Sequence, residues 1–157
     1  FGSSPSLGPP LRVLAAMLAV TSAAWRRHSG KLGTTAVRAI TDVASKESFE
    51  ELVSAKATPA LVFYTAAWCK PCQDVAPHLE ALGARLEGPD LRVLRVDVQE
   101  HASLAGEQGV KAVPLFAFHR DGHVVERLAG CGPESLAEAA ERHVAMHAER
   151  RKKKEEK

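Results

Sequence analysis

Ala60-Leu61-Val62-Phe63-Tyr64-Thr65-Ala66-Ala67-Trp68-Cys69-Lys70-Pro71-Cys72 is the stretch that decides the fold of this chain. The almost continuous apolar run over residues 60–65 is typical of a central strand buried on both faces. Apolar residues at helical spacing follow the cysteines: Val75, Leu79, Leu82 and Leu86. We therefore expect a buried strand that leads, through a Cys-x-x-Cys pair, into a helix ending near Leu86.

The Cys-x-x-Cys pair at the start of a helix predicts thiol–disulfide chemistry. The first helical turn brings the two sulfurs within disulfide reach, and unpaired N–H groups and the helix dipole favour a thiolate on Cys69. The thiolate is the nucleophile of disulfide exchange, and Cys72, one turn further in, is suited to resolve the mixed disulfide. Lys70 adds a cation, and Pro71 lies in the first turn, where a missing N–H costs nothing.

Outside this stretch, strand patterns alternate with helix patterns. We expect strands over 35–40, 60–65, 91–98, 115–119 and 123–128, and helices over 45–56, 69–86, 101–108 and from 134 to about 149 and beyond. The turn signal Arg120-Asp121-Gly122 makes the last two strands a hairpin. The pattern predicts an α/β fold, with a central mixed sheet of about five strands flanked by about four helices.

Trp-Cys-x-Pro-Cys directly after a buried strand resembles the thioredoxin family. Further residues carry the resemblance over about 35–146: Val113-Pro114, Pro77, Val96-Asp97-Val98, Arg120-Asp121-Gly122 and Gly130. The resemblance implies a thioredoxin fold and a protein-disulfide reductase with Cys69 and Cys72 as catalytic residues. It also implies a cis peptide at Val113-Pro114 and a substrate groove formed by Trp68, Lys70, Pro71, Val113, Pro114 and Gly130. The implied partners are protein disulfide substrates and a reductase, with no cofactor.

Three positions depart from the family pattern or add to it. Lys70 stands where the family usually has Gly, so a redox potential is not carried over. Phe63, six residues before Cys69, stands where the family usually has a buried acid that handles protons for the resolving thiol. We therefore expect slower exchange or proton transfer through water. Cys131 falls near the groove, either as a small apolar residue or as an accessory thiol.

Composition limits the other classes of function. Residues 42–148 contain ten basic and sixteen acidic side chains, so the domain has no basic footprint for nucleic acid. Three cysteines without a second Cys-x-x-Cys do not complete a four-ligand zinc site, and we expect no metal. His143 and His147 share one helix face, which we interpret as a solvated side of the last helix.

Both ends of the chain differ from the middle. Residues 1–34 form an N-terminal extension that is rich in Ser, Ala and Arg and lacks acids, which resembles a transit peptide. A secretory signal and a partner-binding tail are the alternatives, and the apolar stretch over 13–24 is short for a membrane span. Residues 35–146 form the thioredoxin-like domain, and 147–157 a charged helical extension. We expect a mitochondrial location, with plastid and secretory routes as alternatives.

Two functions are consistent with these observations. The first is a free thiol–disulfide oxidoreductase that exchanges the Cys69–Cys72 pair with protein substrates. The second is a thioredoxin-fold accessory subunit of a large membrane or ribonucleoprotein complex in an organelle, bound through the two tails. The second hypothesis is motivated by the basic tails and by Phe63 in place of the acid.

Overall fold

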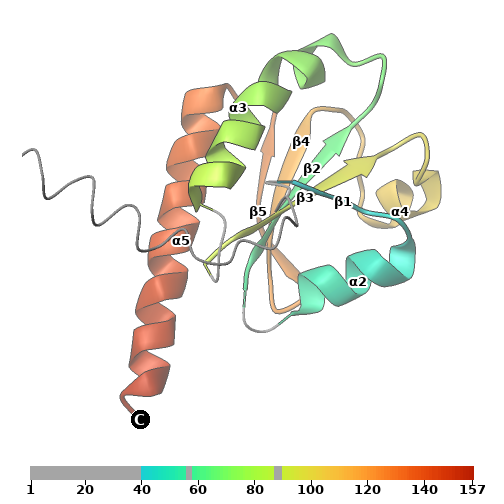
Figure 1. The fold of residues 1–157 in the computed structure, drawn as a ribbon. Helices are drawn as coiled ribbons and strands as arrows, with labels where there is room; N and C mark the ends of the chain where they lie inside the picture. Colours follow the sequence, from blue (N-terminus) through green and yellow to red (C-terminus); the bar gives the residue numbers. More distant parts are fainter. Residues whose placement is uncertain (1–39, 56–57, 87–89) are drawn as a thin grey trace, which may run out of the picture. The chain divides into compact units, whose positions relative to one another are not determined.

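A computed structural model of the chain describes residues 40–55, 58–86 and 90–157. Within these residues the elements follow in the order shown in Figure 1. The strands are β1 (Thr41–Asp42), β2 (Ala60–Thr65), β3 (Arg92–Asp97), β4 (Leu115–Arg120) and β5 (His123–Ala129). The helices are α2 (Lys46–Ser54), α3 (Lys70–Leu86), α4 (Ala102–Glu107) and α5 (Pro133–Glu155). Within the described part of the chain, no helix is long and apolar enough to span a membrane.

The strands form one mixed sheet in the order β1-β3-β2-β4-β5. β2 runs parallel to β3 and antiparallel to β4, so the strand that leads to the cysteines lies at the centre of the sheet. β4 and β5 pair as an antiparallel hairpin, with Asp121 and Gly122 at positive φ in the turn. The expected α/β architecture is confirmed.

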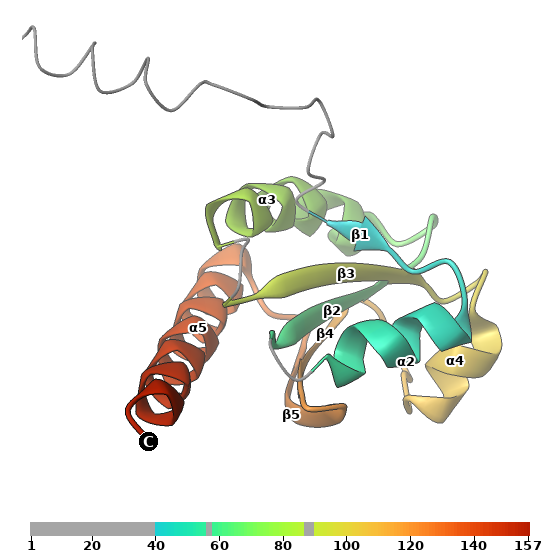
Figure 2. The same ribbon diagram turned by 60° about the horizontal axis from the view of Figure 1, so that its bottom comes forward.

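Helices cover both faces of the sheet, and this explains the unbroken apolar run of β2 (Figure 2). On one face, Leu61 and Phe63 pack with the buried side chains of α3 and α5. On the other face, Val62 and Tyr64 pack with Phe49 and Val53 of α2 and with Leu104 of α4. Because successive strand residues point to opposite faces, every position of a doubly covered strand must be apolar.

The element boundaries differ from the expected ones mainly at the ends. Residues 35–39 of the expected first strand lie outside the described residues, as does the whole extension over 1–34. β1 itself covers Thr41–Asp42. α2 ends at Ser54, two residues earlier than expected, and begins with a capping box in which Ser45 and Ser48 exchange hydrogen bonds.

α5 passes without a break through the proposed boundary at residue 147. Beyond that boundary, Arg151 Nη1 donates to Asp90 Oδ1 at 2.7 Å, and His147 Nδ1 lies 3.4 Å from the same oxygen. The first part of the charged extension is therefore tied to Asp90, two residues before β3. The division of the chain into three segments stays a prediction.

The interpretation of His143 as part of a solvated face is wrong. Its side chain is buried, stacks on Phe118 and lies 2.8 Å from Glu126 Oε2 through Nε2. Arg120 Nη2 is 3.3 Å from the other ring nitrogen. The register of α5 against β4 and β5 turns this histidine toward the sheet, and partners from two strands supply the polar contacts that solvent would otherwise provide.

A second histidine, His119, is buried without any hydrogen-bond partner among the described residues. It is 2% exposed, and its ring lies edge-on to Phe49 at 5.6 Å between centroids. Burial, together with the positive charge of Arg127, lowers the pKa of His119 from 6.5 to about 4. The core therefore holds this imidazole in its neutral form.

Acidification should destabilise the fold through His119. The unfolded chain binds a proton at this position near pH 6.5, whereas the folded chain binds it only near pH 4, so stability falls as the pH drops between these values. The shift corresponds to a loss of at most about 3 kcal/mol. We expect His119→Leu to flatten the pH dependence of urea unfolding in this window.

The matched control is His78→Leu, which removes a histidine from an exposed position of α3. It should leave the pH dependence as in the wild type. An unchanged slope in His119→Leu would contradict the assignment, because Glu126 and His143 would then account for all of the acid sensitivity.

Candidate active site

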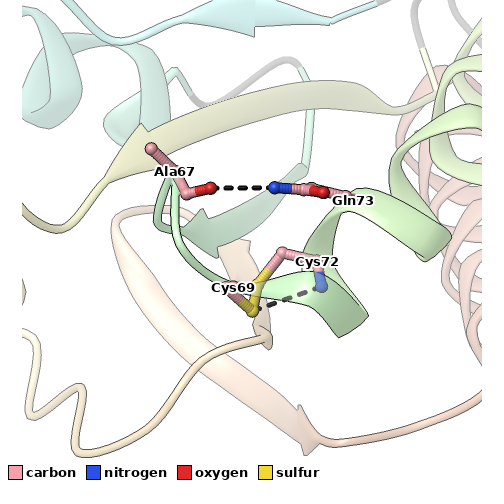
Figure 3. Close-up of a disulfide and its surroundings, with 4 residues drawn as sticks. All are labelled: Ala67, Cys69, Cys72 and Gln73. Carbon is pink, nitrogen blue, oxygen red and sulfur yellow. Dashed lines mark hydrogen bonds between the residues drawn. A yellow bond between two sulfur atoms is a disulfide. The ribbon is translucent and has the colours of Figure 1, made fainter.

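The connection between β2 and α3 places Cys69 at the N-cap of the helix. The carbonyl of Cys69 accepts the first helical hydrogen bond, from Gln73 N–H at 3.2 Å, and Cys69 N–H donates to Ala66 O at 3.1 Å. The amide side chain of Gln73 donates to Ala67 O at 2.8 Å (Figure 3). These bonds join the loop to the first turn of α3 and fix the position of the leading sulfur.

The Cys69 sulfur occupies the place of a capping side-chain oxygen. The N–H of Cys72, the third residue of α3, points at Cys69 Sγ at 3.2 Å (Figure 3). In an ordinary N-cap, Ser or Asp accepts this hydrogen bond. A sulfur at this position accepts from a backbone N–H that has no partner within the helix, and it lies at the positive end of the helix dipole. Both interactions stabilise a thiolate on Cys69 after reduction.

Cys69 and Cys72 form a disulfide, with their Cα atoms 5.2 Å apart. Both residues are buried, at 3% and 1% exposure. Around them the surface is open: Trp68 is 68% exposed, and Lys70 and Pro71 are also exposed. The disulfide is thus set into the surface next to a large exposed aromatic ring, where a second protein can reach it.

The Val113–Pro114 peptide bond is cis, as the family resemblance implies. Pro114 is buried at the start of β4, and its carbonyl accepts a hydrogen bond from Gly130 N–H at 3.3 Å. Gly130 has a φ of +58°, which a residue with a side chain rarely adopts. Val113 packs against the same apolar cluster that contains Cys69 and Cys72.

Cys131 packs against the same cluster as a partly buried free thiol. Burial raises the pKa of its thiol, although a backbone hydrogen bond acts in the opposite direction. Less thiolate is then present near neutral pH, which reduces nucleophilicity. Within the described residues, no group of three or more His, Cys, Asp or Glu side chains is placed to hold a metal ion.

A pocket of about 590 Å³ lies behind the disulfide, on the side of Cys72. Phe63 forms part of its wall, buried and stacked on Phe116 at 5.0 Å between centroids. The charged part of the wall comes from β1, β3 and the turn after β3: Asp42, Arg95, Asp97 and Glu100. These carboxylates are not among the site residues expected from the sequence. The position of Asp97 near the site could have been predicted from the sequence, because Thr65 and Asp97 are the last residues of neighbouring parallel strands.

Lys70 is not a free cation beside Cys69. Its Nζ lies 2.7 Å from Asp74 Oδ1, one helical turn further on, and both side chains are largely exposed. Such a pair is weak because solvent screens it. Lys70 can therefore still favour a thiolate on Cys69, but Asp74 opposes part of the effect.

Comparisons with known proteins agree with this geometry. The family model "Thioredoxin" matches residues 40–142. Thioredoxin Asp f 29 of Aspergillus fumigatus is 35% identical over 109 residues, covering 69% of this chain and 96% of the relative. Mitochondrial thioredoxin 3 of Saccharomyces cerevisiae superimposes with a TM-score of 0.59 at 29% identity, over 65% of this chain and 93% of that one. Thioredoxin f from spinach chloroplast superimposes with a TM-score of 0.59 at 32% identity, over 66% of this chain and 92% of that one.

Removal of the Lys70 charge should slow the reaction of Cys69. In reduced protein carrying Cys72→Ser and Cys131→Ser, we expect Lys70→Ala to lower the rate of iodoacetamide alkylation at neutral pH by about twofold, the size of a surface charge effect. Asp74→Asn should raise that rate, and both effects should shrink at high salt. Lys153→Ala, at an exposed position in the last turn of α5, is the control and should change nothing. A salt-independent effect would show that Lys70 acts other than by its charge.

Proposed function

The chain belongs to the thioredoxin family, and from this premise we propose that Cys69 is the nucleophile and Cys72 the resolving thiol of its dithiol site. The protein is a thiol–disulfide oxidoreductase that acts on protein disulfides together with a reductase. The single observation that supports our assignment of roles is the hydrogen bond from Cys72 N–H to Cys69 Sγ at the start of α3. It stabilises charge on Cys69 and not on Cys72.

The proposed reaction has two exchange steps. The Cys69 thiolate attacks one sulfur of a substrate disulfide, forms a mixed disulfide and releases the other substrate sulfur as a thiolate, which takes up a proton. Cys72 then loses its proton and attacks Cys69 Sγ. The mixed disulfide breaks, the second substrate thiol leaves, and the Cys69–Cys72 disulfide remains. Two electrons have passed to the substrate, and the reductase returns two electrons to the pair.

We propose that the substrate chain lies against Trp68, the cis peptide and the exposed first turn of α3. Two observations support this groove. Trp68 offers a large exposed apolar surface next to the disulfide. Tryptophan is enriched among the residues that contribute most to binding at the centre of protein–protein interfaces. The hydrogen bond between Gly130 and Pro114 fixes the peptide that precedes β4. Cys131 takes no part in the proposed exchange, because burial disfavours its thiolate.

The two single cysteine variants should behave differently. We expect Cys69→Ser and Cys72→Ser each to abolish the reduction of insulin disulfides by the protein. Only Cys72→Ser should accumulate a covalent complex with substrate that dithiothreitol releases, because the first exchange step still occurs and the second does not. Cys131→Ser is the matched control and should retain activity. A trapped complex with Cys69→Ser instead would reverse the assigned roles.

We also propose a mitochondrial location. The support is the acid-free, Arg-containing composition of residues 1–34, together with the likeness to a yeast mitochondrial thioredoxin. The likeness to a spinach chloroplast thioredoxin supports the plastid alternative in the same way. The comparisons do not favour the accessory-subunit hypothesis, since the relatives reported above are thioredoxins.

Import of the full chain separates the candidate organelles. We expect isolated mitochondria to protect it from added protease, and Arg26→Glu with Arg27→Glu to prevent this, because a transit peptide needs its positive charge. The control is Arg150→Glu with Arg151→Glu at the other end of the chain. Protection by chloroplasts or microsomes but not by mitochondria would replace the proposal with the plastid or the secretory alternative.

A further inference from the structure

The resolving thiol needs a proton acceptor, and the pocket behind it contains candidates. Cys72 must lose its proton before it can attack Cys69 Sγ. The residue is 1% exposed at the molecular surface, yet it forms part of the wall of the 590 Å³ pocket. The pocket has room for several water molecules, and polar groups line one side of it. A proton can therefore leave Cys72 through water in this pocket.

The sheet register decides which polar groups lie beside Cys72. Phe63 pairs with Arg95, and Thr65 pairs with Asp97, across the parallel strands β2 and β3. Because side chains alternate along a strand, these four share one face of the sheet. That face is the one α3 covers, since Phe63 and Cys72 belong to the same apolar cluster. Phe63 leaves β2 without a carboxylate there, and β3 supplies one at Asp97.

The three carboxylates of the pocket are not equivalent. Asp42 is joined to Arg95, whose Nε lies 2.5 Å from Asp42 Oδ1, so its charge is already compensated. Glu100 is exposed on the turn after β3. Asp97 is half-buried at the end of β3, and its Oδ1 accepts the N–H of Gln99 at 2.8 Å. That bond fixes the carboxylate, and in the described part of the chain no donor engages the second oxygen.

We propose that Asp97 is the proton acceptor for Cys72 and that the proton passes through water in the pocket that both residues line. This inference rests on the proposed role of Cys72 as the resolving thiol. In the second exchange step, the Cys72 proton moves by way of water to the Asp97 carboxylate, while the sulfur forms its bond to Cys69 Sγ and the substrate thiolate leaves. The proton then passes to solvent or to that thiolate. When the reductase opens the disulfide, the same groups return a proton to Cys72.

Other charged side chains lie around this proton path and act electrostatically on Asp97. Arg95 attracts Asp97 from two residues earlier on β3, and Glu80 of α3 also interacts with Arg95. Asp42 from β1 and Glu100 from the turn add negative charge at the wall. Asp97→Asn removes the basic oxygen and retains an oxygen that can accept from Gln99 N–H. The substitution therefore tests proton transfer with little change to the turn.

The test separates the two exchange steps. Reduced protein is mixed with an aromatic disulfide that releases one coloured thiolate when Cys69 attacks and a second when Cys72 resolves the mixed disulfide. We expect Asp97→Asn to leave the first phase unchanged and to slow the second by about tenfold near pH 6.5, a modest loss for a base acting through water. Near pH 9 the difference should narrow to about twofold or less, because most thiol then ionises without help.

Two further variants complete the experiment. Glu138→Gln makes the same charge change at an exposed position of α5 outside the pocket and should leave both phases as in the wild type. Asp97→Glu should recover part of the second phase. The inference is overturned if Asp97→Asn slows the second phase equally at every pH, slows both phases alike, or has no effect. If the wild type shows no second phase at all, the proposed role of Cys72 fails instead.

Discussion

The site depends on one local constraint, the sulfur of Cys69 at the N-cap of α3. A capping position normally holds an oxygen, and here Cys72 N–H donates to Cys69 Sγ. The interaction is available only because β2 ends at Thr65 and the next residues bond back to the loop, through Cys69 N–H to Ala66 O. A strand buried on both faces cannot shift along the sheet without exposing apolar side chains. The core therefore determines where the reactive sulfur lies.

The same burial makes it harder to remove the proton from the resolving thiol of Cys72. β2 lies at the centre of the sheet with helices on both faces, and an aromatic residue at 63 fills the space under α3. Phe63 stacks on Phe116 and strengthens that core. It also removes an acid from the strand nearest to Cys72. Proton transfer then depends on groups of the next strand, at the rim of a water-accessible pocket, and β3 is where the chain has Arg95 and Asp97.

Much of the fold could be predicted from the sequence, because apolar periodicity and turn residues report burial directly. The buried run before Cys69, the hairpin at Asp121 and Gly122 and the cis bond before Pro114 appear as expected. Contacts between distant segments could not be predicted in this way. His143 has the spacing of a solvated helix face, yet the packing of α5 on β4 buries it against Phe118. The ion pair between Lys70 and Asp74, by contrast, has the i, i+4 spacing that pairs opposite charges on a helix, so it could have been predicted from the sequence.

The pocket shows what a sequence motif leaves undetermined. The motif specifies the two sulfurs and the helix that holds them, but the rate of the second exchange depends on which side chains share a sheet face with Cys72. That relation is one of register: Thr65 lies opposite Asp97, and Phe63 opposite Arg95, only for one pairing of β2 and β3. Relatives with the same Cys-x-x-Cys segment can thus move protons by different residues. A carboxylate on the neighbouring strand can serve Cys72 provided that water connects the two groups, and an aromatic side chain at position 63 is then compatible with exchange.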